Sequence, residues 1–471
     1  MPKFLKIIFS LNFLYIIAIA AQVAAIIFLC VYIPSTLPIA LAFSAVWILD
    51  GICALILFSK KGAPEVKCVW FLLIAALPVV GAIIYLFAAS DKKPCGTLKI
   101  VNGNKTGLNG AANLLCGTAL AGYDEAMYFP DGESFFFAAI SEIERAKKSV
   151  FVEFFIIERG NLFERVLAAL KKARENGAEV KIITDGVGSA FRLRKREIKR
   201  LKSDGIEVRI FQKITPLPRA KLNLRDHRKI ITVDGKVAFT GGVNLADEYI
   251  NIDSPYGYWK DTGVAVYGEA AKIFEDMFLA MFEGNCREIS APRKGNKNCL
   301  PICDSPPLNS ICEDAYACAI CSANERIHIM TPYFCPSDKL LSALAFAARR
   351  GVDVKIILPH IPDKKYAFEI SKAYARSLIT CGVKFYEFTP GFMHAKNAIF
   401  DNRCFIGSYN FDFRSTHFNH ECGVMFEDEM TCEAEKDFEK CLALSSPFSE
   451  IKISPMKKFA VFILKIFSPL M

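Results

Sequence analysis

The chain has 471 residues, of which 52% are apolar, and a formal net charge of +9. This length allows two or three domains with large buried cores, and the apolar excess is concentrated in the first 90 residues. Most of the 17 cysteines follow residue 90, without the dense, regular spacing of a secreted disulfide scaffold. The composition excludes that class of small secreted protein and favours a reducing compartment for the later part of the chain.

Three apolar runs at the start of the chain predict a membrane anchor over residues 1–90. They extend from Leu11 to Ile33, from Leu37 to Phe58 and from Val69 to Ala89, each near the ~20 residues that cross a bilayer. The first run lacks the cleavage site and polar continuation of a signal peptide. Because Asp50 interrupts the second run and the first could lie along the interface, we expect two or three transmembrane helices.

The orientation of this anchor is not decided by charge. Lysines 60, 61 and 67 precede the last run and lysines 92, 93 and 99 follow it, so the positive-inside rule favours neither orientation. The scattered cysteines favour the cytoplasmic side for the catalytic part. We therefore expect a multi-pass protein of the cell membrane, with residues 91–125 as a connector.

A long internal duplication follows and determines the predicted fold. The first copy reads "AKKSVFVEFFI", "LAALKKARENGAEVKIITD", "IKRLKSDGIEVRIF" and "DHRKIITVDGKVAFTGGVN". The second reads "ANERIHIMTPYF", "LSALAFAARRGVDVKIILP", "ARSLITCGVKFYEF" and "MHAKNAIFDNRCFIGSYN". We predict a first lobe at residues 126–285, a second at 311–450, and a linker between them at 286–310, which lacks periodicity and is rich in Pro, Asn and Lys.

Each copy alternates short β-branched strands with amphipathic helices, and glycines mark the turns from helix to strand. This alternation predicts an α/β fold with largely parallel strands. Each lobe should be an αβα sandwich, and the two should pair about a pseudo-twofold axis.

The segment from Arg192 to Lys202, "RLRKREIKRLK", holds seven cations against one Glu. A solvated helix face and a surface that attracts anionic phospholipid are both consistent with it, and a nucleic acid would satisfy the same charge. Residues 451–471 pair Lys457, Lys458 and Lys465 with an apolar face, as an interfacial or a packing helix would.

The last block of each copy carries the same polar pattern, His-x-Lys-x4-Asp. His227, Lys229 and Asp234 in the first copy match His394, Lys396 and Asp401 in the second. Positions i and i+2 of a strand point to one face, so each histidine and lysine should project together. If the two faces meet at the interface of the lobes, two imidazoles and two ammonium groups share one pocket.

Such a pocket suits a phosphodiester. The lysines, with Asn244, Asn410 and Ser408, can hold the phosphate oxygens, while one imidazole attacks phosphorus and the other protonates the leaving oxygen. We expect no metal or cofactor, because the lysines supply positive charge and no carboxylate cluster for Mg²⁺ accompanies either motif. Asp234 and Asp401 are catalytic candidates, but each equally fits a residue that forms the turn after its strand.

At these residues the chain resembles the phospholipase D superfamily, the HKD enzymes, and within it the bacterial cardiolipin synthases. The resemblance extends to "YWKDTGVAVYGEAA", "TPYF" and "FDFRSTHFNHECGVMF". It implies transfer of a phosphatidyl group between two phosphatidylglycerol molecules, with His227 as nucleophile, His394 as acid and Glu421 orienting a catalytic histidine. The order of the two histidines comes by analogy and could be reversed.

Other functions stay open on the motifs alone. A phospholipase or nuclease of the same fold would use water in place of the alcohol, and a lipid-binding protein would leave the site idle. The anchor favours a lipid over a nucleic acid, and we expect a membrane partner and no nucleic acid. The acceptor and the oligomeric state are not predicted.

Overall fold

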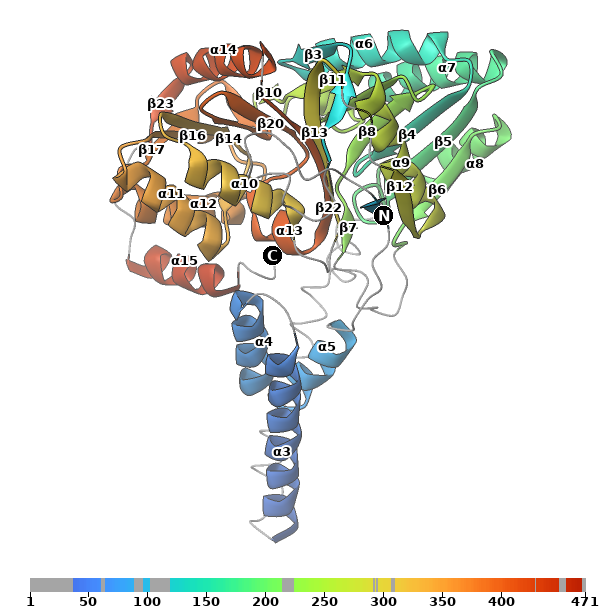
Figure 1. Cartoon of the computed structure of the whole chain (residues 1–471). Helices are drawn as coiled ribbons and strands as arrows, with labels where there is room; N and C mark the ends of the chain where they lie inside the picture. The colour runs from blue at the N-terminus through green and yellow to red at the C-terminus, as the bar shows by residue number, and fades with distance from the viewer. Residues whose placement is uncertain are drawn as a thin grey trace. The chain divides into compact units, whose positions relative to one another are not determined.

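The computed structural model describes residues 37–60, 64–88, 96–101, 119–213, 224–290, 293, 295–305, 310–427, 429–448 and 455–467. These residues belong to two compact units (Figure 1). One holds the helices that precede residue 91, and the other holds the elements from β1 (Thr97–Val101) to α15 (Pro455–Phe467).

The first unit contains α3 (Leu37–Ser59), α4 (Pro64–Ala76) and α5 (Val80–Ala88). The second predicted run coincides with α3, whereas the first lies outside the described residues. Within the described part of the chain, no helix is both long enough and apolar enough to span a membrane.

The third predicted run, Val69 to Ala89, is not one continuous helix. It is divided at Pro78 into α4 and α5, because proline has no N–H to donate and its ring clashes with the preceding turn. Val79 adopts a φ of 65°, which turns the chain back on itself. The two helices then pack so closely that a Cβ on Gly81 would lie 2.4 Å from the carbonyl oxygen of Leu73.

The second unit is built on two large mixed sheets, one for each copy of the duplication. The first sheet has the order β3-β11-β9-β8-β4-β5-β6, and the second has β2-β13-β22-β20-β19-β14-β16-β17-β23. The first contains β3 (Ala126–Phe129), β4 (Ser149–Phe154), β5 (Glu179–Asp185), β6 (Glu207–Phe211), β8 (Lys229–Val233), β9 (Val237–Gly241) and β11 (Gly263–Tyr267). The second contains β2 (Ala121–Tyr123), β13 (Lys297–Asp304), β14 (Arg326–Met330), β16 (Asp353–Pro359), β17 (Lys384–Phe388), β19 (Asn397–Phe400), β20 (Arg403–Gly407), β22 (Asn419–Phe426) and β23 (Ser445–Pro447).

The duplication is visible in the strand order, because β11-β9-β8-β4-β5-β6 and β22-β20-β19-β14-β16-β17 follow the same sequence of elements. The prediction of largely parallel pairing is wrong. Within the two sheet orders given above, β4-β5-β6 and β14-β16-β17 pair in parallel, while the strands that follow the motif histidines pair antiparallel with their neighbours. Tight turns after each motif strand return the chain directly, so no crossover helix separates these strands.

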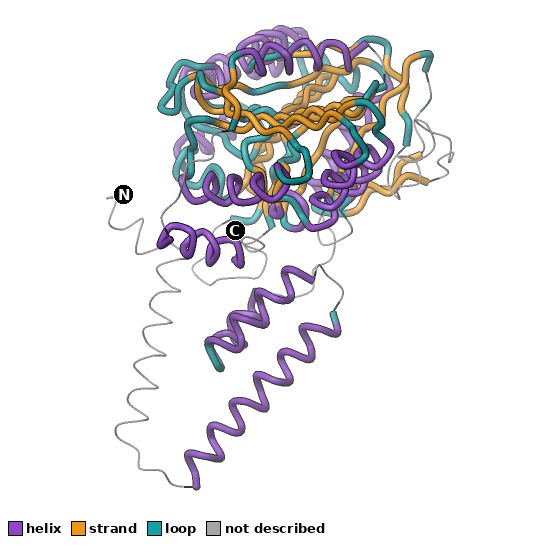
Figure 2. The backbone as a smooth tube through the Cα atoms, turned by 90° about the vertical axis from the view of Figure 1, so that its left-hand side faces the viewer, coloured by secondary structure: helices purple, strands orange, loops and turns teal. Residues whose placement is uncertain are grey.

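Helices cover both faces of the sheets (Figure 2). In the first half these are α6 (Gly132–Arg145), α7 (Asn161–Glu175), α8 (Lys195–Ser203) and α9 (Glu269–Glu283). In the second they are α10 (Ile311–Ser322), α11 (Asp338–Arg349), α12 (Lys365–Ile379) and α14 (Glu429–Ala443).

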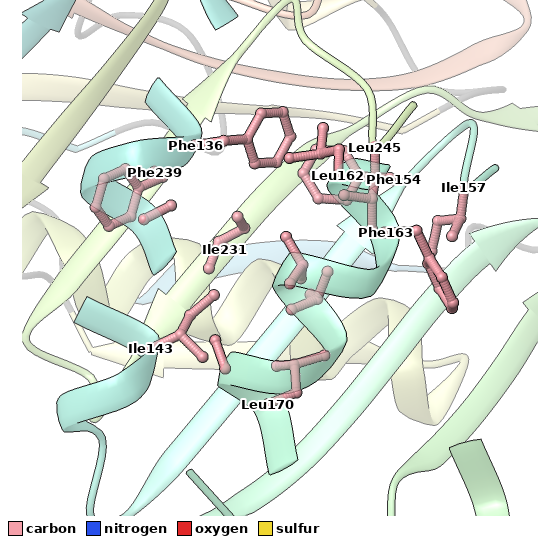
Figure 3. Packing of buried hydrophobic residues seen from close by; sticks show 14 of the residues in the cluster. Phe136, Ile143, Phe154, Ile157, Leu162, Phe163, Leu170, Ile231, Phe239 and Leu245 are labelled. Carbon is pink, nitrogen blue, oxygen red and sulfur yellow. The ribbon is translucent and has the colours of Figure 1, made fainter. Parts of the chain in front are cut away.

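Alternate strand residues enter different cores, as the period of two requires. Val150, Val152 and Phe154 of β4 pack in the core shared with α6 and α7, whereas Phe151 packs with Phe278 of α9. Figure 3 shows Phe154 in this core beside Leu162 of α7. A further core joins residues of both halves, among them Ile230 of β8 and Ile399 of β19. The two halves therefore share one of the apolar cores of this unit.

The prediction of a linker at residues 286–310 is wrong in part, because this segment contains two strands. β12 (Cys286–Ser290) pairs with β1, and β13 pairs with β22 of the second sheet. The run Cys299–Asp304 is buried, so its apolar residues form sheet core despite the Pro, Asn and Lys around them.

The described part of the C-terminal segment is the helix α15. It packs against α12, where the Lys465 ammonium lies 4.4 Å from the ring centre of Tyr374. Val461 is buried, whereas Met456 and Phe462 are exposed. One side of α15 thus contacts the domain and another presents apolar side chains to the surroundings.

The two motif aspartates form turns. Asp234 and Asp401 both adopt a φ of 55°. The Asp234 carboxylate accepts the N–H groups of Lys147, Lys148 and Ser149, and Asp401 accepts the N–H groups of residues 324–326. Each therefore fixes the start of the strand beside its motif strand, which supports the turn-forming interpretation.

We predict that Asp234→Ala lowers the free energy of unfolding by about 1–3 kcal/mol, because it leaves backbone donors without their acceptor. Chemical denaturation followed by circular dichroism would show a lower midpoint. Asp234→Asn, which tolerates the left-handed conformation, should lose less. An unchanged midpoint in Asp234→Ala would contradict the turn assignment.

Candidate active site

Both motif histidines lie in the short segment that leads into a sheet strand, at the junction of the two halves. His227 and His394 precede β8 and β19, and the backbone N–H of each donates to the other half: His227 to the carbonyl of His420 (3.0 Å) and His394 to that of Lys260 (2.7 Å). These bonds extend the short parallel pairs β7 (Arg225–Asp226) with β22 and β10 (Tyr258–Lys260) with β18 (Gly391–Met393). Each histidine is thus anchored on the other lobe.

The His227 imidazole is oriented by a carboxylate of the second half. Its Nδ1 lies 2.9 Å from both oxygens of Glu421. Glu421 also accepts the Ser408 hydroxyl at 2.5 Å and the Asn419 amide at 3.1 Å. Burial raises the pKa of Glu421 to about 7, although Lys229 and Ser408 oppose this shift.

The His394 imidazole is oriented in the same way by the first half. Its Nδ1 lies 2.6 Å from Asp261, whose other oxygen accepts the N–H of Thr262 at 2.9 Å. Burial acts to raise the pKa of Asp261, but Lys396 and His394 hold it below its usual value. Sequence reasoning did not identify Asp261. The signal was present, because "WKDTGV" and "NHECGV" occupy corresponding places in the two copies.

The crossed carboxylates explain a difference between the copies. Gly242 stands where the second copy has Ser408, and a Cβ at Gly242 would lie 2.0 Å from the Asp261 carboxylate. Ser408 instead donates to Glu421 and accepts the backbone N–H of Cys422 at 3.0 Å. The Ser408 hydroxyl therefore holds Glu421, and its contact with phosphate stays a prediction.

Both motif lysines are buried beside the imidazoles. The Lys396 ammonium lies 2.7 Å from Nδ1 of His394, and the Lys229 ammonium donates to the carbonyl of His227 at 2.5 Å. Burial lowers the pKa of Lys229 to about 8 and that of Lys396 to about 7. The charge of Lys229 also contributes to the lowered pKa of Lys396.

The imidazoles are neutral at physiological pH. Burial, followed by the charges of Lys229 and Lys396, lowers the pKa of His227 well below its usual value. Burial and Lys396 lower the pKa of His394 to about 3, and Asp261 opposes the shift. A carboxylate fixes each imidazole through Nδ1 and so directs Nε2 away from that carboxylate. Nε2 of His394 lies 3.1 Å from the Lys396 ammonium.

Aromatic rings surround the two imidazoles unequally. Phe155 contacts His227 with ring centres 5.2 Å apart. Tyr249, Trp259 and Phe392 surround His394 with ring centres 5.0–5.6 Å away. These rings exclude water and account for the desolvation that lowers both pKa values.

The two asparagines flank the motifs but are partly engaged. The Asn244 carbonyl accepts the N–H of Ile156 at 3.1 Å, and its amide donates to Tyr249 at 2.7 Å. The backbone N–H of Asn410 donates to Ser415 at 3.2 Å, and its buried side-chain oxygen has no protein donor among the described residues. The structure does not bring Asp234 or Asp401 to the histidines, because each stands at the far end of its motif strand, about 16 Å of extended chain beyond the lysine.

Comparison with known proteins agrees with this geometry. A family described as "Cardiolipin synthase, PLD-like domain" matches residues 139–278 and 316–442. A protein of uncharacterised function from Streptococcus mutans is 39% identical over 73% of this chain and 78% of its own length. A cardiolipin synthase from Alkalihalophilus pseudofirmus is 31% identical over 84% of this chain and 85% of its own length.

Among solved structures, phosphatidylserine synthase from Haemophilus influenzae shares the fold. The TM-score is 0.59 at 14% sequence identity, over 75% of this chain and 97% of that protein. The family match covers both copies of the duplicated block and ends within each copy's last helix. The chain therefore belongs to the phospholipase D-like cardiolipin synthase family.

Proposed function

We propose that this protein is a phosphatidyltransferase that makes cardiolipin and glycerol from two molecules of phosphatidylglycerol. The observation that carries the proposal is the pair of His-Lys motifs at one junction, each histidine held by a carboxylate of the other half. The cardiolipin synthases among its relatives support the choice of a lipid phosphodiester.

In the first step, Nε2 of His227 attacks the phosphorus of one phosphatidylglycerol. A bond forms between nitrogen and phosphorus, the bond from phosphorus to the head-group glycerol oxygen breaks, and His394 gives its proton to that oxygen. A neutral imidazole is required for the attack, which the low pKa of His227 supports. Splitting one displacement into two steps through a phosphohistidine lowers the barrier of each.

In the second step, a hydroxyl of another phosphatidylglycerol attacks the phosphohistidine. His394, now neutral, removes the hydroxyl proton, and the bond from phosphorus to His227 breaks. The acid role suits His394 because Asp261 remains ionised and stabilises an imidazolium at 2.6 Å. Glu421, with its pKa raised to about 7, gives His227 less support for a positive charge.

The lysines neutralise the phosphate charge that develops in both steps. A bound phosphodiester anion favours the protonated forms of Lys229, Lys396 and His394, whose pKa values are lowered in the free protein. Substrate binding thus supplies the negative charge that lets His394 hold the proton it must donate. The side chains of Asn244 and Asn410 complete the phosphate contacts in this proposal.

The N-terminal part serves as a membrane anchor in this proposal, with the catalytic part on the cytoplasmic side. The apolar runs before residue 90 support it. The exposed apolar side chains of Met456 and Phe462 on α15 support contact of the C-terminal segment with the lipid interface.

The products test the reaction type. Purified protein in detergent micelles should convert labelled phosphatidylglycerol into equimolar cardiolipin and glycerol, separated by chromatography. Phosphatidic acid as the sole lipid product would instead indicate hydrolysis. Complete absence of turnover would contradict any enzymatic role.

The two histidines have separable roles. With a phosphatidyl ester of nitrophenol, which leaves without an acid, His394→Ala should release one equivalent of nitrophenol and retain a phosphatidyl group on His227, located by peptide mass spectrometry. His227→Ala should give no burst, and both variants should lose cardiolipin synthesis by more than about 10³-fold. His360→Ala, which removes a half-exposed ring, is the control. A label on His394 would reverse the assignment.

The lysine pKa values predict a pH dependence. Positive charge in the free site is lost as the pH rises through the values of about 7 and about 8 for Lys396 and Lys229. The value of kcat/KM at low phosphatidylglycerol should therefore fall between pH 7 and 9, measured at constant ionic strength. The exposed Lys436→Arg should reproduce the wild-type profile. A flat profile to pH 9.5 would show that these lysines keep their protons.

A further inference from the structure

A basic surface next to His227 has no part in the chemistry described above. It consists of the loop between β5 and α8 together with α8 itself, and we define it by Val187, Phe191, Arg194, Lys195, Arg196, Lys199 and Lys202. These residues include most of the cationic segment singled out in the sequence.

The inner side of the loop is fixed to the protein. The N–H groups of Val187 and Gly188 donate to Asp185 at 2.7 and 3.0 Å, and the Ser189 hydroxyl accepts the N–H of Ile157 at 2.9 Å. Arg192 donates to Glu158 at 2.5 Å and to Glu248 at 3.2 Å. The loop therefore presents its outer residues in a defined position.

The same loop adjoins the catalytic histidine. Gly188 packs so closely that a Cβ there would lie 2.2 Å from the carbonyl oxygen of Phe155, and the Phe155 ring contacts the His227 ring. Asp185, which holds the loop, also accepts the backbone N–H of Asp226 at 3.1 Å, one residue before His227. Phe155 therefore contacts both the loop and the imidazole.

The outer side of the basic surface combines cations with apolar groups. Phe191 is 62% exposed and Val187 is 42% exposed, and Arg194, Lys195, Arg196, Lys199 and Lys202 are all exposed. The described carboxylates near this helix pair instead with Arg159, Lys171, Arg192 and Arg200. Five exposed cations thus lack an ion pair with any described carboxylate.

We infer that the basic surface docks on an anionic phospholipid bilayer and places the entrance to His227 at the lipid head groups. This inference rests on the proposed function, because it assigns a docking role to a surface beside that active site. The cations attract anionic head groups, and Phe191 and Val187 enter the interface as apolar anchors of a charged surface do.

A duplex nucleic acid would satisfy the charge but not the apolar groups. Nucleic-acid surfaces favour basic patches interleaved with polar donors to phosphate, whereas an exposed Phe beside a cationic helix fits the boundary between head groups and acyl chains. The adjacent histidine also needs a substrate that resides in the bilayer under the proposed function. The bilayer is therefore the partner favoured by the residues on this surface.

The test compares the full-length protein with a triple variant, Lys195→Gln, Arg196→Gln and Lys199→Gln, and with Phe191→Ser. Two substrates are used: water-soluble short-chain phosphatidylglycerol below its micelle concentration, and long-chain phosphatidylglycerol diluted in neutral detergent micelles. For the triple variant, the apparent KM for micellar substrate should rise by about tenfold or more, since each cation contributes roughly fivefold to surface binding. Phe191→Ser should raise it in the same direction, and turnover of the soluble substrate should stay within twofold of wild type.

The control variants remove three cations and one aromatic ring from helices outside the basic surface. Lys272→Gln, Lys436→Gln and Lys440→Gln remove three exposed cations from α9 and α14, and Phe346→Ser removes an exposed ring from α11. These controls should leave both activities unchanged. An unchanged micellar KM in the triple variant, or an equal rise in the controls, would overturn the inference.

Docking of the basic surface on a membrane can also be measured without enzymatic turnover. Loss of wild-type turnover on the soluble substrate would contradict the proposed function but not the surface. Amide hydrogen exchange of residues 186–202 should then still slow in nanodiscs containing phosphatidylglycerol and not in nanodiscs of phosphatidylcholine, and the triple variant should lose this protection. Equal exchange in both lipids, or stronger protection by duplex DNA than by anionic lipid, would refute membrane docking.

Discussion

Each half supplies the carboxylate that orients the motif histidine of the other half, and the active site depends on this arrangement. His227 is oriented by Glu421 of the second half, and His394 by Asp261 of the first. The backbone N–H of each histidine also donates to the residue directly before the carboxylate that orients it. Neither half by itself contains a motif histidine together with the carboxylate that orients it, so the site is complete only when the two halves are packed together.

Buried hydrogen bonds also join the two halves at their interface. Lys260, the residue before Asp261, is buried and donates to Asp437 of α14 at 2.7 Å, and the Tyr128 hydroxyl donates to the same carboxylate at 2.7 Å. Residues of both halves also pack together in the shared apolar core. Breaking a buried pair of this kind would leave a charge without its partner, so the position of the His394–Asp261 pair is strongly determined.

Burial of the lysines and imidazoles makes the site reactive, and it also lowers the stability of the folded protein. Two lysines and two imidazoles are kept from water, which lowers the pKa of each toward the neutral form. In the proposed reaction, the neutral imidazoles accept phosphorus or a proton, and the anionic substrate favours the charged form of the lysines. The unfolded chain binds protons at these histidines from pH 6.5 downward while the folded protein does not, so their contribution to stability falls as the pH falls.

The sequence by itself determined the duplication, the order of strands and helices within each copy and the residue types of the motifs, because these depend on local periodicity and on a repeat that can be read directly. Only the tertiary structure decided which carboxylate meets which histidine: Asp261 and His394 are 133 positions apart, and no local pattern links them. It also decided that Asp234 and Asp401 form turns, that residues 286–290 and 297–304 are strands, and that most of the pairing is antiparallel. The reason is that hydrogen-bond partners across a sheet and between lobes are chosen by long-range packing, whereas periodicity reports only which face of an element is buried.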